Sequence, residues 1–166
     1  MTPAEAVTRL NTVLAHAWMI RTFLKHADEI QQSDEMLEVP RTLYDSIRAV
    51  EPAFQRHDHG DYLRRLKGKL PKLRRIADYF HHHYKQFSPH TNFEMAAISL
   101  QGVVQQIDEI LQQVDWTEVG KLLPGHPSSA DTANPPTSAD TANPPASADT
   151  ANPPADPLDQ LEIPEV

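Results

Sequence analysis

Residues 61–87 read DYLRRLKGKLPKLRRIADYFHHHYKQF. This segment combines an apolar stripe, the densest positive charge in the chain and three consecutive histidines. The stripe recurs every three or four positions, which is the period of a helix that buries one face. It consists of Tyr62, Leu66, Leu70, Leu73, Ala77, Phe80 and Tyr84. A helix of this length runs for about 40 Å, so other helices must cover the stripe.

Three further segments carry helix-start signals followed by the same apolar period. Thr2 and Glu5 form a capping box around a proline at the first helical position, and Ser33 precedes a second, acidic first turn. Thr91 and Glu94 form another capping box ahead of the most regular apolar stripe. These signals predict three helices that pack on the helix of residues 61–87.

Proline interrupts two of the predicted helices. Pro40 either kinks the second helix or begins it after a short turn, because proline removes an amide donor yet suits a first turn. Pro71 lies where the apolar stripe continues on both sides, which predicts a kink in the third helix rather than its end. We expect Asp61 to cap that third helix, and Trp18 and Phe23 to fill the core.

Four amphipathic helices joined by short turns predict an all-α fold. The expected architecture is an antiparallel up-down-up-down four-helix bundle over residues 1–123. A short helical turn at Trp116 is expected to fold Val119 and Leu122 back onto this bundle.

Two opposite charges, Arg21 and Asp28, fall on the apolar face of the first helix. In one interpretation Arg21 lies at the margin of the stripe and pairs with a carboxylate of a neighbouring helix. In the other, the two residues define a polar pocket inside the bundle.

Charge divides the chain into two unlike parts. All 15 lysine and arginine residues lie at or before Lys121, together with 16 of the 23 acidic residues. The remainder carries seven acidic residues and no lysine or arginine, so the net charge of −8 belongs mainly to the tail. The absence of cysteine excludes disulfides, thiol catalysis and cysteine-bound zinc. With no signal peptide and no long apolar run, we expect a cytoplasmic protein.

The segment after Pro124 is repetitive and polar. SADTANPP recurs at residues 129–136, 138–145 and 147–154, without any large apolar side chain to bury. We predict a disordered linker rich in proline, alanine and aspartate over residues 124–155. Residues 156–166 bring back Leu158, Leu161 and Ile163 among acids, as either an unstructured end or a motif that docks on another protein. In layout alone, linker and peptide resemble the tails of proteins loaded into bacterial protein shells, without a recognisable loading motif.

The nine histidines are the first candidates for metal ligands. Haemerythrin-like and ferritin-like bundles place histidine and carboxylate ligands on inward helix faces, the second of them as Glu-x-x-His pairs. This chain has no such pair; its nearest form is Asp78 followed by His81, and His90 stands at a helix start. His57 and His59 lie in a predicted turn that could hold zinc or nickel. The metal-binding alternative therefore uses these five residues, with His16 from the first helix.

The basic residues of the third helix form the second candidate site. A stripe of lysine and arginine on one helix can bind phosphates, which allows weak nucleic-acid binding. No stacking aromatics alternate with these charges, and acidic residues of the second helix explain them equally well as ion-pair partners. Those acids are Glu35, Glu38, Asp45 and Glu51.

Motifs of the common enzyme classes are missing from the sequence. It has no glycine-rich phosphate loop, no G-x-S-x-G and no H-E-x-x-H, which disfavours an enzyme, and we expect no cofactor. We predict a non-catalytic interaction module that binds a protein partner or itself, away from membranes. Its expected contact residues are Arg64, Arg65, Lys72 and Arg75 on the basic helix and Leu158, Leu161 and Ile163 in the tail.

Overall fold

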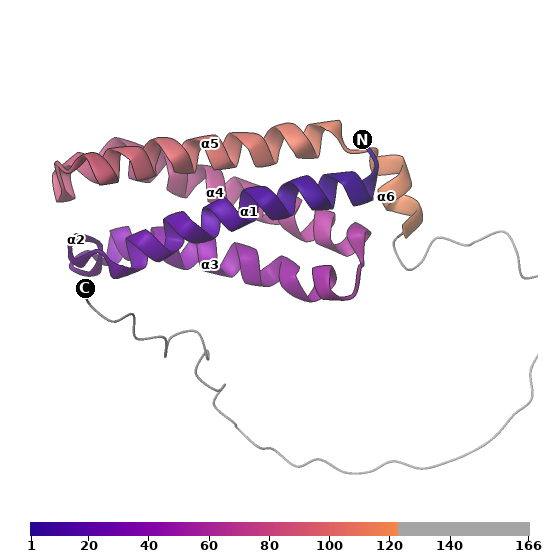
Figure 1. The fold of residues 1–166 in the computed structure, drawn as a ribbon, viewed down its shortest axis with the longest axis horizontal. Helices are drawn as coiled ribbons and strands as arrows, with labels where there is room; N and C mark the ends of the chain where they lie inside the picture. Colours follow the sequence, from indigo (N-terminus) through magenta and orange to yellow (C-terminus); the bar gives the residue numbers. More distant parts are fainter. Residues whose placement is uncertain (123–166) are drawn as a thin grey trace, which may run out of the picture. The chain divides into compact units, whose positions relative to one another are not determined.

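The computed structural model describes residues 1–122, which form six α-helices and, within that range, no strand (Figure 1). The all-α prediction is therefore confirmed. The helices are α1 (Pro3–His26), α2 (Asp28–Gln31), α3 (Asp34–Gln55), α4 (His59–Phe87), α5 (Thr91–Gln113) and α6 (Trp116–Leu122). The predicted linker of residues 124–155 and the terminal peptide of residues 156–166 lie outside the described residues.

The four long helices lie side by side around one apolar core (Figure 1). α1 and α4 each pack against both α3 and α5, while α2 is a single turn between α1 and α3. The start of α1 meets the end of α5, where the Met1 ammonium donates to the Gln113 carbonyl at 3.0 Å. At the other end of the molecule, the Ser88 hydroxyl donates to Glu29 at 3.3 Å.

Side-chain caps set the starts of α1 and α3 as the sequence predicts. The Glu5 amide donates to the Thr2 hydroxyl oxygen at 3.3 Å, and the Thr2 amide donates to the Glu5 carboxylate at 2.9 Å, which completes the capping box. That backbone hydrogen bond lowers the pKa of Glu5 below its usual value. At α3 the Met36 amide donates to the Ser33 hydroxyl oxygen.

The predicted caps of α4 and α5 are wrong. α4 is capped by Asp58, whose carboxylate accepts from the Asp61 amide at 2.9 Å, so Asp61 lies inside the first turn. α5 begins at Thr91 itself, and its cap residue, His90, makes no side-chain capping hydrogen bond. Because Thr91 is already helical, its hydroxyl is not placed to cap the amides that follow.

The prolines do not end their helices. α3 begins at Asp34 and continues through Pro40, so the interpretation in which a helix begins at Pro40 is wrong. The buried residues Met36 and Val39 lie before Pro40, and burying them as helix outweighs the lost amide donor. α4 likewise continues through Pro71, as the unbroken stripe predicts.

The core consists of the predicted stripes, with corrections at their margins. Every member of the α4 stripe is buried. Phe23 is 36% exposed and packs edge-on against Phe93, with ring centroids 5.4 Å apart, while Trp18 is half-buried, so neither fills the core as expected. In α6, Val119 is buried as predicted, but Leu122 is exposed.

Arg21 makes neither of the contacts foreseen for it. Its guanidinium lies 4.8 Å from the Trp18 ring centroid and 5.0 Å from that of Tyr44, as a cation–π contact between α1 and α3. Asp28 is exposed at the first residue of α2. The two charges therefore do not enclose a polar pocket.

None of the helices in residues 1–122 combines the length and the apolar character needed to span a membrane.

Candidate functional site

Three arginines surround one buried carboxylate at the start of α4. Asp61 is only 6% exposed. It accepts from Arg64 at 2.7 Å through one oxygen and from Arg65 at 2.7 Å through the other. Arg56, the residue that follows α3, reaches the second oxygen at 3.4 Å. We call Arg56, Arg64 and Arg65 the triple-arginine cluster.

Local sequence spacing builds this cluster. Arg64 and Arg65 lie three and four positions after Asp61, so the helix places all three side chains on one face. Arg56 arrives from the preceding helix through a tight loop in which His57 adopts a φ of 56°. The Arg65 guanidinium also donates to the Ala49 carbonyl of α3 at 3.5 Å, which joins the two helices.

The cluster carries more positive than negative charge. One carboxylate faces three guanidinium groups, whose side chains are 58%, 65% and 45% exposed for Arg56, Arg64 and Arg65. The hydrogen bond from Arg64, followed by that from Arg65, holds the pKa of Asp61 below its usual value, although burial acts in the opposite direction. Asp58, the cap residue, is the other acid of this turn and is already bound to an α4 amide.

An exposed aromatic residue of α3 contacts the first turn of α4. Phe54, near the end of α3, is 42% exposed, and its ring centroid is 6.2 Å from that of Tyr62. Tyr62 follows Asp61 directly and is buried in the core. The loop end of α3 and α4 therefore carries both an exposed ring and an excess of positive charge, which would suit a ligand with carboxylates and apolar groups.

The remaining basic residues of α4 are mostly matched one to one. Lys72 pairs with Glu38 of α3 at 2.9 Å, and this contact lowers the pKa of Glu38. Arg74 pairs with Asp108 of α5 at 2.6 Å. The Lys67 ammonium lies 4.0 Å from the ring centroid of Trp116, as a cation–π contact. Of the four acids predicted to pair with this helix, only Glu38 forms an ion pair with it among residues 1–122.

Arg75 is the exception, because no ion pair forms to it within residues 1–122. It lies at the edge of a shallow, largely apolar groove of about 250 Å³ between α3 and α4. Val39, Ile76 and Tyr79 line this groove, and Glu38 lies at its rim. Arg75 is thus an exposed arginine beside this groove, and its predicted role as a contact residue stays a prediction.

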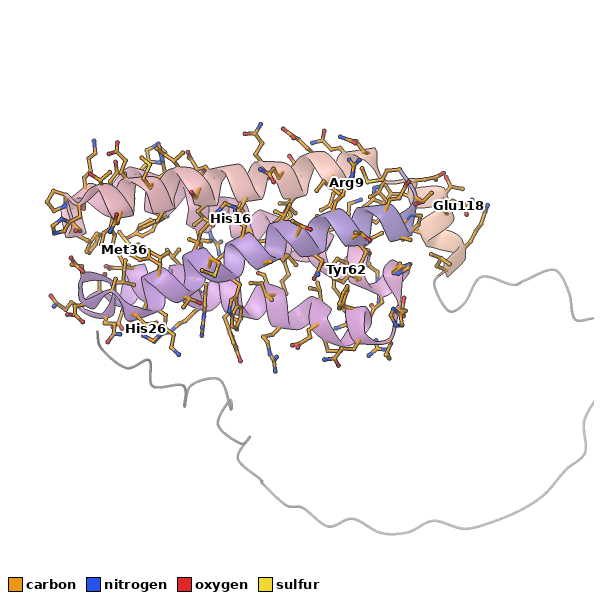
Figure 2. All side chains as sticks on the ribbon, in the orientation of Figure 1. Arg9, His16, His26, Met36, Tyr62 and Glu118 are labelled. Carbon is orange, nitrogen blue, oxygen red and sulfur yellow. The ribbon has the colours of Figure 1, made fainter. Side chains whose placement is uncertain are left out.

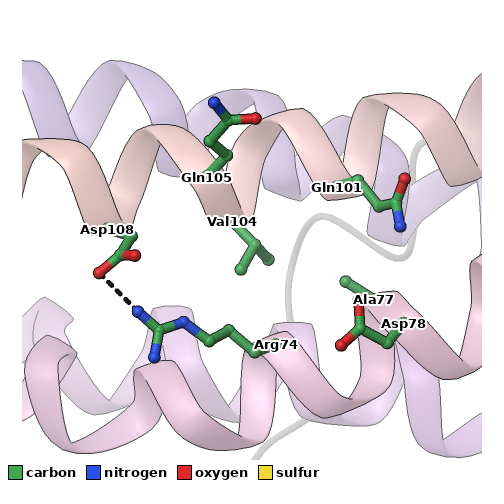
Figure 3. A pocket seen from close by; sticks show the side chains of 7 residues that line it. All are labelled: Arg74, Ala77, Asp78, Gln101, Val104, Gln105 and Asp108. Carbon is green, nitrogen blue, oxygen red and sulfur yellow. Dashed lines mark ion pairs between the residues drawn. The ribbon is translucent and has the colours of Figure 1, made fainter.

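A second groove runs between α4 and α5, with a volume of about 430 Å³ (Figure 3). Figure 3 shows the Arg74 guanidinium directed across this groove to Asp108, with Gln101 farther along α5. Asp78 lies exposed on α4 along the same groove. The ion pair also borders an apolar hollow beside Trp116, of about 410 Å³. Arg74 and Asp108 neutralise each other here, so Asp78 leaves the groove with a negative charge and no surplus cation.

The candidate metal ligands come from different elements of the fold. His57 lies in the loop before α4, His59 is the first residue of α4, Asp78 and His81 lie in its second half, and His90 precedes α5. His16, labelled in Figure 2, is exposed on α1. Within residues 1–122 the structure brings no three histidine, aspartate or glutamate side chains into a group that could hold a metal ion.

Sequence reasoning missed two parts of the cluster. It treated Asp61 as a helix cap and left Arg56 out, whereas the structure makes Asp61 the shared acceptor. The signal was present, since an aspartate followed three and four residues later by arginines is a helical ion-pair spacing. Leu158, Leu161 and Ile163, the predicted contact residues of the tail, lie outside the described residues.

Comparison with protein-family models, curated proteins and solved structures finds no match to this chain.

Proposed function

We propose that this protein is a non-catalytic interaction module, an antiparallel four-helix bundle that binds an acidic protein partner through the start of α4. The observation that supports this most is the triple-arginine cluster, in which three exposed guanidinium groups share the single carboxylate of Asp61. Guanidinium groups bind carboxylates through paired hydrogen bonds, and their weak hydration suits them to interfaces. A partner carboxylate would find donors here that the protein itself does not fully use.

The basic surface extends from the cluster toward Arg75. Arg64, Arg65 and Arg75 are exposed residues of α4, and Arg75 borders the apolar groove between α3 and α4. Lys72, the fourth predicted contact residue, is held by Glu38 and is expected to contribute less. Apolar contacts at this groove and at Phe54 would add the desolvated centre that charged contacts alone do not provide.

The second part of the proposal concerns the tail. A linker of the composition of residues 124–155 spans about 30 Å as a flexible coil, so it tethers the terminal peptide at a high local concentration. Leu158, Leu161 and Ile163 alternate with acids in that peptide. They would dock in a partner's apolar groove, while the bundle holds the same partner through its arginines.

Affinity capture with the full chain tests both parts. We expect Arg56→Gln/Arg64→Gln to release the partner, because it removes the excess charge while Arg65 still neutralises Asp61. Deletion of residues 156–166 should also release it without changing the melting temperature. The matched control is Arg48→Gln, an exposed arginine of α3 that pairs with Glu51. An unchanged set of captured proteins in both variants would contradict the proposal.

A further inference from the structure

The face of the bundle formed by α1 and α5 carries a band without charge. Residues 10–20 of α1 and residues 95–107 of α5 contain no lysine, arginine, aspartate or glutamate. Three large apolar side chains of this band are exposed: Met19 by 67%, Met95 by 48% and Ile98 by 51%. Charged residues are depleted and methionine is enriched in the buried centres of protein interfaces, so this composition is typical of a contact surface.

Two contacts bring these stretches of α1 and α5 to the same level of the bundle. The Met1 ammonium donates to the Gln113 carbonyl at one end of the helix pair, and the Phe23 ring packs against Phe93 at the other. α1 and α5 are therefore antiparallel neighbours along most of their length (Figure 1). We call the exposed side chains of residues 10–20 and 95–107 the neutral face.

The charges that border the neutral face fit a second copy of the chain. Arg9 of α1 and Glu109 of α5 are both exposed, and neither forms an ion pair within residues 1–122. Both lie toward the end of the helix pair where Met1 meets Gln113. A two-fold rotation about an axis parallel to the helices places α1 of each copy over α5 of the other, which brings Arg9 level with the second copy's Glu109. The surface thus meets itself with opposite charges.

The size and the centre of the neutral face also suit a dimer. α1 has 24 residues and α5 has 23. Two such helices side by side present about 700 Å², close to the roughly 800 Å² that each partner buries in a standard interface. Gly102 follows Ile98 by four positions on the same side of α5, and a Cβ added there would meet no atom within 4 Å. The bundle itself does not need this glycine, whereas a glycine lets another backbone approach closely.

We propose that the neutral face binds a second copy of this protein, in a symmetric dimer with α1 of each copy over α5 of the other. This surface is separate from the start of α4. Because α1 and α4 each pack against both α3 and α5, the α1–α5 pair lies on the other side of the bundle from the α3–α4 pair. The dimer therefore leaves both triple-arginine clusters accessible and offers two of them to one partner.

Sedimentation equilibrium of the full chain tests the dimer, because this method reports mass independently of shape. We expect twice the 18.7 kDa of one chain at about 200 µM protein, and a dilution series gives the dissociation constant. The mass of a single chain at that concentration would overturn the proposal.

Two variants of similar exposure locate the interface. Ile98→Asp should raise the dissociation constant of the dimer at least tenfold, since it places a charge within the neutral face. Leu122→Asp changes an apolar side chain of α6 that is 53% exposed, and it should alter the dissociation constant less than twofold. Equal effects of the two variants would overturn the proposal.

A pair of glycine variants separates dimer formation from folding. Gly102 of α5 and Gly68 of α4 both lie inside helices with open space at the Cβ position. Gly102→Gln and Gly68→Gln should both keep the helix content measured by circular dichroism. Only Gly102→Gln should raise the dissociation constant at least tenfold, because its side chain would block the approach of the other copy. An unchanged constant in Gly102→Gln would overturn the proposal.

A charge exchange tests the orientation of the two copies. Arg9→Glu and Glu109→Arg each bring like charges together and should weaken the dimer, while the double variant should restore it. A double variant no better than either single variant would overturn the proposed arrangement. The outcome is separable from that of the proposed function, because none of these substitutions alters the triple-arginine cluster. A monomer that still captures a partner would overturn this inference alone, and a dimer without partner capture would overturn the proposed function alone.

Discussion

The beginning and the middle of α4 carry similar positive charge but use it differently. At the beginning, Arg64 and Arg65 share Asp61 with Arg56. In the middle, Lys72 has Glu38 to itself and Arg74 has Asp108, which leaves Arg75 as the one arginine there without an ion pair among residues 1–122. Positive charge is therefore in larger excess at the beginning of α4, where we propose the binding surface.

The contrast follows from what each part of α4 faces. The middle of α4 packs between α3 and α5, whose acids reach across to it from both sides. The beginning of α4 lies next to the α3–α4 loop, where a third arginine adds to the excess instead of cancelling it. Exposed one-to-one pairs leave little field at a distance, because each charge is screened by its partner and by salt.

Removal of the shared carboxylate should have the largest effect on stability. We expect Asp61→Ala to lower the free energy of unfolding by about 2 kcal/mol, since it leaves three arginines without their charge-assisted hydrogen bonds. Asp108→Ala, which breaks one exposed pair with Arg74, should cost less than about 1 kcal/mol. Urea denaturation measures both. Equal decreases in the free energy of unfolding would show that the beginning and the middle of α4 do not differ in this way.

Acid should weaken the same region. The hydrogen bonds from Arg64 and Arg65 hold the pKa of Asp61 below its usual value of about 3.9, so its stabilising contribution is complete above that pH and is lost as the pH falls through the folded-state pKa. We expect the free energy of unfolding to decline below about pH 4, and to decline less in Asp61→Asn. Chemical denaturation of both proteins between pH 7 and pH 3 tests this. If the free energy of unfolding declined equally with pH in both proteins, protonation of Asp61 would not be the cause of the loss of stability.

Tyr62, which follows Asp61, also carries a buried polar group. The Tyr62 hydroxyl is buried and has no hydrogen-bond partner among residues 1–122, and burial raises its pKa. Because an unpaired buried hydroxyl is unfavourable, Tyr62→Phe should raise the free energy of unfolding by about 1 kcal/mol. A loss of stability in the same urea assay would mean that the hydroxyl is paired in solution.

The smallest effect is expected for a single matched pair. A double-mutant cycle on Arg74 and Asp108 should give a coupling of about 0.5 kcal/mol, because both side chains are partly exposed. A coupling above about 2 kcal/mol would show that this pair is as tightly held as the cluster, which would weaken the comparison.

The sequence was sufficient to predict the helices, because apolar periodicity and caps are local signals. The buried stripe of α4, the capping box of Thr2 and the short helix at Trp116 are all in the structure. The cap of α4 was missed because Asp58 and Asp61 lie three residues apart, and either is a reasonable cap by type.

Only part of the candidate site could be predicted, because the pairing of its charges depends on residues that lie far apart in the sequence. Arg64 and Arg65 stood out by composition. Whether a cation is matched depends on acids of other helices, such as Asp108 for Arg74, and the register between helices is not written in any one segment. The exposure of Phe54 was hidden in the same way, since its position continued the apolar stripe of α3.

Mapping where an acidic probe binds tests the central claim most directly. A short polyglutamate peptide would be titrated into the ¹⁵N-labelled full chain with the tail acids replaced, and amide shifts followed by NMR. The account predicts the largest shifts at residues 54–65, around the triple-arginine cluster, and little change at residues 105–111 of α5, around the Arg74–Asp108 ion pair. Equal shifts in both regions, or shifts confined to residues 105–111, would contradict it.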